Sequence, residues 1–188
     1  MRLFVALTPP GEVVEALRVG TQELREYAPE LRWTRPEQWH VTLAFLGDVG
    51  DDVVDELARR LGRAAARHPA LALALAGGGR FGHRVLWTGV RGDRDSLRRL
   101  ADSTRAAARR SRLAVEHRPY RPHVTLARAD GAVDLRPLVE RLAPWHGPQW
   151  AASRLQLVRS HLGAAPGGWA LHEPIAGWPL GSVPAEHQ

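Results

Sequence analysis

One pentapeptide, His-Val-Thr-Leu-Ala, occurs twice in this chain of 188 residues, at residues 40–44 and again at residues 123–127. Its β-branched and apolar residues favour a strand over a helix. Because side chains alternate between the two faces of a strand, the histidine and threonine of each copy share one face, and the valine and leucine share the other. The repeat therefore predicts two strands, each with a buried apolar side and an imidazole beside a hydroxyl on the other side.

Two interpretations of the repeat are open. The polar residues could be satisfied groups on two equivalent core strands of a duplicated fold. Apolar positions repeat easily because many residues can fill a core, whereas a polar His-x-Thr repeats mainly when its chemistry is used. We therefore favour a catalytic interpretation, in which the two pairs meet across a cleft and supply two proton-transfer groups and two hydroxyl donors. The four residues are His40, Thr42, His123 and Thr125.

The composition excludes several kinds of chemistry. The chain has no cysteine, which rules out disulfides, thiolate zinc sites and a cysteine nucleophile. All 26 residues counted as lysine or arginine are arginine, so no lysine can form a Schiff base, accept a nucleotidyl group or complete a P-loop. The net charge of +6 suits an anionic partner such as RNA or a nucleotide.

Length and hydropathy indicate one domain, because 188 residues with 44% hydrophobic content can form one substantial core and no linker divides the chain. No apolar run is long enough to cross a membrane, and residues 1–7 are too short for a signal peptide. We expect a cytoplasmic monomer with a single domain over residues 1–180 and a loose tail at residues 181–188.

Hydrophobic periodicity predicts strands and helices in alternation. Strands are expected at residues 2–7, 31–34, 39–46, 71–75, 84–90, 149–160 and 169–175 and at the second pentapeptide, and helices at residues 10–27, 51–65, 93–110 and 135–142. These elements and the repeated motif argue for a duplicated α+β fold. The three glycines at 77–79 lack the spacing and the lysine of a P-loop, and we interpret them as a bulge or loop where backbones approach closely.

The two copies diverge at the residue that follows each pentapeptide, Phe45 and Arg128. Strict alternation places this residue on the other face of the strand from its histidine, unless a bulge or a strand end intervenes. Phe45 is therefore either a core aromatic or a platform for a stacked base, and the charged Arg128 is a candidate for holding phosphate or ribose. Arg121 would share the face of His123 if the strand began before Pro122.

A metal site is not indicated. None of the other histidines forms an HExxH-like spacing, and a zinc ion bound by His40 and His123 would need a third ligand that the sequence does not identify.

With both motifs in view, the chain resembles the 2H phosphoesterase superfamily, whose signature is a His-x-Thr-x motif that occurs twice. Within it, residues 1–175 are similar to the bacterial and archaeal RNA 2',3'-cyclic phosphodiesterases, also called 2'-5' RNA ligases. The stretches that carry this resemblance are 1–7 with Pro9-Pro10, Arg32-Trp33, 40–47, Phe81-Gly82, 84–90, 118–128 and 157–160.

The resemblance implies a bilobal fold with pseudo-twofold symmetry, in which two antiparallel sheets flanked by helices enclose a central cleft. It also implies a hydrolase that uses no metal or organic cofactor and opens a 2',3'-cyclic phosphate at an RNA end to leave a 2'-phosphate. In that reaction His40 is the proton donor to the leaving O3' and His123 is the proton acceptor that activates water. The symmetric motifs alone do not distinguish these roles. Hydroxyls of Thr42 and Thr125 would bind the non-bridging phosphate oxygens.

Three alternatives remain at this point. The same site could catalyse reversible 2'-5' RNA ligation or cleave a small cyclic nucleotide. A second class is an RNA-binding module without catalysis, although both intact motifs argue against it. The third is a metal-dependent hydrolase, which a chelator would inhibit.

Overall fold

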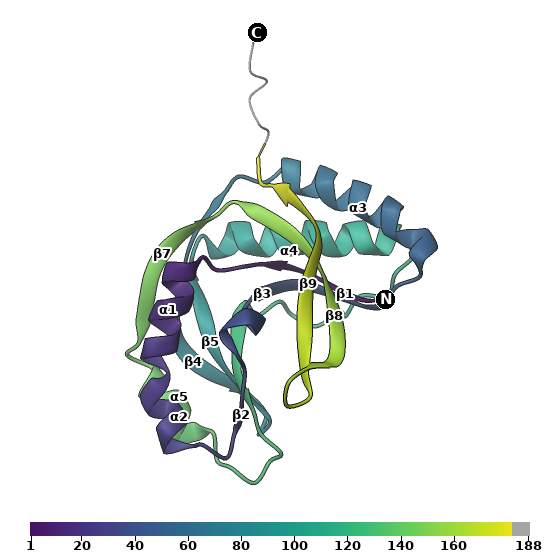
Figure 1. Cartoon of the computed structure of the whole chain (residues 1–188). Helices are drawn as coiled ribbons and strands as arrows, with labels where there is room; N and C mark the ends of the chain where they lie inside the picture. The colour runs from purple at the N-terminus through teal and green to yellow at the C-terminus, as the bar shows by residue number, and fades with distance from the viewer. Residues whose placement is uncertain (182–188) are drawn as a thin grey trace.

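The computed structural model describes residues 1–181 and contains two antiparallel sheets with helices packed around them (Figure 1). The elements are β1 Arg2–Leu7, α1 Gly11–Gly20, α2 Gln22–Tyr27, β2 Arg32–Trp33, the 3-10 helix η1 Pro36–Gln38, β3 Val41–Asp48, α3 Asp51–Ala66, β4 Leu71–Phe81, β5 Val85–Gly92, α4 Arg94–Arg110, β6 His123–Arg128, α5 Arg136–Leu142, β7 His146–Ala152, β8 Arg154–Ala165 and β9 Trp169–Pro179. The predicted α+β class with two antiparallel sheets is confirmed. Most of the predicted tail, residues 182–188, lies outside the described residues.

The strand order places one copy of the pentapeptide in each sheet. The four-stranded sheet has the order β3-β1-β8-β9, and the five-stranded sheet has the order β2-β6-β5-β4-β7. The first copy leads into β3 and the second forms β6. Both sheets combine strands from the first and second halves of the chain, so that β1 pairs with β8 and β2 pairs with β6.

The helices bury one apolar face each, as their periodicity predicts. Helices α3 and α4 lie side by side over one end of the molecule (Figure 1), and Leu57, Leu61, Leu97 and Leu100 of these helices are fully buried. Helices α1, α2 and α5 lie at the other end (Figure 1). Two aspartates, Asp51 and Asp52, lie in the first turn of α3, where carboxylates favour the positive end of the helix dipole.

One predicted strand, residues 149–160, is wrong. The chain forms two strands there: β7 belongs to the five-stranded sheet and β8 to the four-stranded sheet, with only Ser153 between them. The buried apolar positions change phase at this corner, from Trp150 and Ala152 to Leu155 and Leu157. This break in the alternation is a local sign of the change of sheet, and a single strand does not account for it. The predicted helix at 10–27 is likewise two helices, which meet at Thr21.

The glycine segment confirms the predicted bulge, but within a strand that is longer than expected. β4 continues through the glycines to Phe81, and its register against β5 shifts between Ala76 and Gly79. A Cβ on Gly79 would lie 2.2 Å from the ring of Trp87. Glycine is therefore required there because the indole occupies the place of a side chain.

Candidate active site

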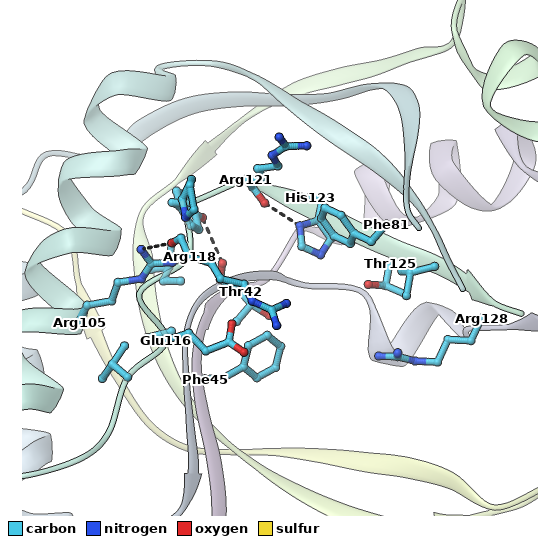
Figure 2. A pocket seen from close by; sticks show the side chains of 16 residues that line it. Thr42, Phe45, Phe81, Arg105, Glu116, Arg118, Arg121, His123, Thr125 and Arg128 are labelled. Carbon is cyan, nitrogen blue, oxygen red and sulfur yellow. Dashed lines mark hydrogen bonds between the residues drawn. The ribbon is translucent and has the colours of Figure 1, made fainter. Parts of the chain in front are cut away.

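A cavity of about 580 Å³ opens between the two sheets (Figure 2). It is lined by residues of β3, β4, β5 and β6, by Arg105 of α4 and by the segment 115–121, which precedes β6. All of the predicted site residues except His40 line this cavity, namely Thr42, Phe45, Arg121, His123, Thr125 and Arg128. The structure therefore brings residues of both pentapeptides to one cavity.

Each pentapeptide contains a β-bulge at the same position. In the first copy Ala6 is opposite Thr42, and the next residue, Val5, is opposite Ala44, so Leu43 has no cross-strand partner. In the second copy Thr125 is opposite Trp87 and Ala127 is opposite Leu86, so Leu126 has none. A bulge inserts one extra residue and reverses the alternation of faces beyond it.

The bulges decide which way the next residue points. Leu43 and Ala44 are both buried, as are Leu126 and Ala127. Phe45 and Arg128 therefore return to the cavity side, where Phe45 is 57% exposed. The interpretation of Phe45 as a core aromatic is wrong.

His123 has a defined tautomer. Its Nδ1 lies 2.6 Å from the carbonyl oxygen of Arg121, and because a carbonyl can only accept, Nδ1 carries the hydrogen and Nε2 is left for chemistry. The ring stands edge-on to Phe81 at 4.9 Å between centroids, with Trp87 at 5.9 Å. Burial lowers the pKa of His123, the bond to Arg121 partly opposes this, and the charge of Arg128 lowers the pKa further. β6 begins at His123, so Arg121 reaches the cavity from the preceding loop.

His40 lies between η1 and β3, not within the strand. Its ring stacks on Phe4 with 4.6 Å between centroids and meets His172 edge-on at 5.0 Å. Burial and then the charge of His172 lower the pKa of His40 to about 3, against a hydrogen bond with the backbone of Gln38 that raises it. The charge of His123 lowers it as well, so the two motif histidines are close enough to interact electrostatically.

Several residues of the site lie outside the two pentapeptides, and the motif did not predict them. Phe4 and Phe81 pack against the motif histidines, and the Tyr120 hydroxyl donates a hydrogen bond to the Thr42 carbonyl at 3.1 Å. This bond ties the segment before β6 to β3 and thus joins the two halves of the site. Burial raises the pKa of Tyr120, so its hydroxyl keeps its proton and remains a donor. Glu116 also lines the cavity (Figure 2).

Within residues 1–181, no group of three or more histidine, aspartate or glutamate side chains has an arrangement that could hold a metal ion. The same part of the chain has no helix that is both long and apolar enough to cross a membrane.

Two antiparallel sheets share this cavity, Thr42 from one and His123 and Thr125 from the other line it, and the charge of His123 acts on His40. This arrangement defines a two-histidine class of α+β protein. The family model described as the 2'-5' RNA ligase superfamily matches residues 9–164, and the chain belongs to that superfamily. This confirms the resemblance to the 2H phosphoesterases.

Curated relatives are named RNA 2',3'-cyclic phosphodiesterase. The one from Escherichia coli K12 is 31% identical over 182 residues, which cover 95% of this chain and 96% of the relative. The one from Geobacillus stearothermophilus is 29% identical over 96% of this chain. The chain spans 58% of the length of that relative and 65% of the length of another from Aeropyrum pernix.

Solved structures agree with the fold. E. coli LigT complexed with 3'-AMP superposes with a TM-score of 0.78 and 30% identity, covering 96% of this chain and 98% of LigT. TT0787 of Thermus thermophilus superposes with a TM-score of 0.80 and 27% identity, covering 97% of this chain and 100% of TT0787.

Proposed function

We propose that this protein is an RNA 2',3'-cyclic phosphodiesterase, which hydrolyses a terminal 2',3'-cyclic phosphate to a 2'-phosphate by metal-free acid–base catalysis. The observation that carries the proposal is that Thr42 of the first motif lines one cavity with His123 and Thr125 of the second, while the charge of His123 also acts on His40. The names of the curated relatives support the same activity.

In this mechanism a water oxygen attacks phosphorus as the bond from phosphorus to O3' breaks, roughly in line. His123 accepts the proton of the water at Nε2, and the bond from its Nδ1 to Arg121 orients the ring. His40 donates a proton to O3', so that the products are a 2'-phosphate and a free 3'-hydroxyl. Thr42 and Thr125 donate hydrogen bonds to the non-bridging oxygens, where charge develops.

The donor role of His40 requires a proton that the free protein does not hold at neutral pH, because the pKa of His40 is about 3. A bound phosphodiester carries a negative charge, and a nearby negative charge raises the pKa of an imidazole. Substrate binding therefore favours the protonated form of His40 that the reaction uses. Arg128 binds the phosphate or ribose, Arg121 contributes positive charge at the cavity, and Phe45 offers an exposed ring on which a base stacks.

The decisive experiment uses a short RNA that ends in a 2',3'-cyclic phosphate, with the protein in EDTA. We expect turnover without metal and a product with a 2'-phosphate. A 3'-phosphate product would mean that O2' is the leaving group, and the assigned position of the leaving oxygen at His40 would be wrong. Activity that appears only after zinc or manganese is added would overturn the mechanism.

The family name favours one second candidate, the reverse reaction. Ligation joins a 2',3'-cyclic end to a 5'-hydroxyl end and forms a 2'-5' bond without ATP, so it uses the same groups. Incubation of the two RNA ends at high concentration would reveal it as a longer product. We further propose that the enzyme acts as a monomer, because both motifs come from one chain; light scattering tests this. The cytoplasmic location stays a prediction.

A further inference from the structure

We propose that His172, which no motif marks, is a positioning residue that orients the ring of His40 and controls when His40 carries a proton. This inference rests on the proposed function, because it assigns a partner to one of the two histidines in that reaction. His172 lies on β9, far in sequence from both pentapeptides.

Three rings form a compact cluster on the cleft side of the four-stranded sheet. Phe4 of β1 lies at its base and is 4% exposed. His40 stacks on Phe4, and His172 stands edge-on to both rings, with 5.0 Å between centroids in each case. His40 is therefore held between a flat apolar contact and a second imidazole, and its ring has little freedom to turn.

A hydrogen bond fixes this arrangement at the level of the backbone. The side-chain amide of Gln38 donates to the carbonyl of Ala170 at 3.0 Å and so attaches β9 to η1. Gln38 lies two residues before His40, and its backbone raises the pKa of His40. Gln38 thus connects the strand of His172 to the segment that carries His40.

His172 is the titratable group that faces His40 from β9. Its Nδ1 is buried and has no hydrogen-bond partner among residues 1–181. Its cross-strand partner on β8 is the uncharged Ser160. Glu173, the next residue, is bonded instead to His161 on β8 at 2.8 Å.

The other elements around the pair add few charges. β1 contributes the apolar ring of Phe4, η1 contributes the exposed Glu37, and β6 contributes His123, whose charge also acts on His40. After burial, the charge of His172 is the largest influence that lowers the pKa of His40. Burial also lowers the pKa of His172 itself. Two imidazoles at this separation resist double protonation, so they titrate as a coupled pair.

The cluster makes the two halves of the site unequal. The corresponding neighbours of His123 are Phe81 and Trp87, which do not titrate. Identical pentapeptides therefore place their histidines in different electrostatic surroundings. His172 gives the pair of motifs the asymmetry that a reaction with one acid and one base requires.

The test compares pH profiles of kcat/KM for the wild type and His172→Phe, a variant that keeps the ring and removes the charge. Loss of the opposing charge raises the pKa of His40, so the limb that reports His40 moves to higher pH by about one unit. A shift of the alkaline limb supports the proposal with His40 as the acid, and a shift of the acidic limb supports it with His40 as the base. His161→Phe is the matched control, because His161 is also a histidine of this strand pair but bonds to Glu173 and not to His40. Both limbs of its pH profile should stay where they are in the wild type.

Two further measurements keep the test decisive. His172→Gln is uncharged and smaller, and it should give the same shift if the phenylalanine variant does not fold. An NMR titration of the two imidazoles without substrate should show that His40 titrates at higher pH in either variant than in the wild type. Unshifted limbs in a folded variant, or a His40 titration that does not respond, would overturn the proposal. The NMR result does not depend on turnover and so separates this inference from a failure of the proposed function.

Discussion

At the scale of residues, each motif histidine lies among aromatic rings that remove water from it. Phe4 packs on His40, and Phe81 packs on His123. These contacts lower both pKa values and make the neutral imidazole the resting form. The negative charge of the substrate phosphate then permits one of the two histidines to be protonated. Substrate binding and protonation of the site are therefore linked.

We expect His40→Gln and His123→Gln each to reduce kcat on the cyclic-phosphate RNA by about 10²- to 10⁴-fold, the usual contribution of a general acid or base. His123 lines the cavity, and both histidines are only partly buried, so the glutamine variants should fold, as circular dichroism would show. His146→Gln serves as control, since His146 is exposed on β7 outside the cavity and its loss should leave kcat unchanged. A folded variant of either motif histidine with nearly full turnover would remove that residue from the mechanism.

The threonine hydroxyls give a second test at this scale. Thr125→Val keeps the shape and loses the donor, and kcat should fall by about 10- to 100-fold because developing charge on a phosphate oxygen loses a hydrogen bond. Thr125→Ser keeps the hydroxyl and should retain most of the rate. Equal rates in the two variants would mean that loss of the hydroxyl costs no more than loss of the methyl group, which would contradict a role for the hydroxyl as donor.

At the scale of elements, the two bulges decide what the cavity contains. The sequence predicted β3 and β6 and the shared face of His123 and Thr125 in the second motif, because those follow from local alternation. It could not place Phe45, because the bulge depends on the register of β3 against β1, which the residues of β3 alone do not specify. Nor could it find His172, which reaches the site through the pairing of β9 with β8.

Two substitutions on β3 test the bulge. Phe45→Ala should leave the free energy of unfolding within about 0.5 kcal/mol, because the ring is exposed, while it raises KM by loss of stacking. Leu43→Ala should destabilise the fold by about 2–5 kcal/mol, because Leu43 is 1% exposed. Urea unfolding of both variants measures this. Strict alternation along β3 would put Phe45 on the other face of the strand from Thr42, in the core. It therefore predicts a substantial loss of stability for Phe45→Ala, which the bulge does not.

At the scale of the whole molecule, the buried histidines make stability depend on pH. The pKa values of His40, His123 and His172 are lower in the folded chain than the usual 6.5 of an unfolded one, with burial as the first cause in each case. The unfolded chain therefore binds protons first as pH falls. The contribution of these groups is complete above pH 6.5 and is lost progressively below it.

We expect the free energy of unfolding to decrease from pH 7.5 to pH 5.5, with His40 alone accounting for about 1 kcal/mol after allowance for its partial exposure. Urea unfolding at several pH values within this range measures the slope. His40→Gln should flatten the slope, since it removes one depressed pKa. A wild-type stability that is constant or rises toward pH 5.5 would contradict the burial of these imidazoles.

The interleaving of the two sheets has a consequence for how the chain is made. Leu3 pairs with Arg159 in the four-stranded sheet, so β1 leaves the ribosome long before β8 exists to cover its second edge. An uncovered strand edge attracts other chains, and pairings this distant in sequence form slowly. During synthesis the nascent N-terminal half is therefore the part of this protein most in need of a chaperone, and the last strands to emerge end that dependence.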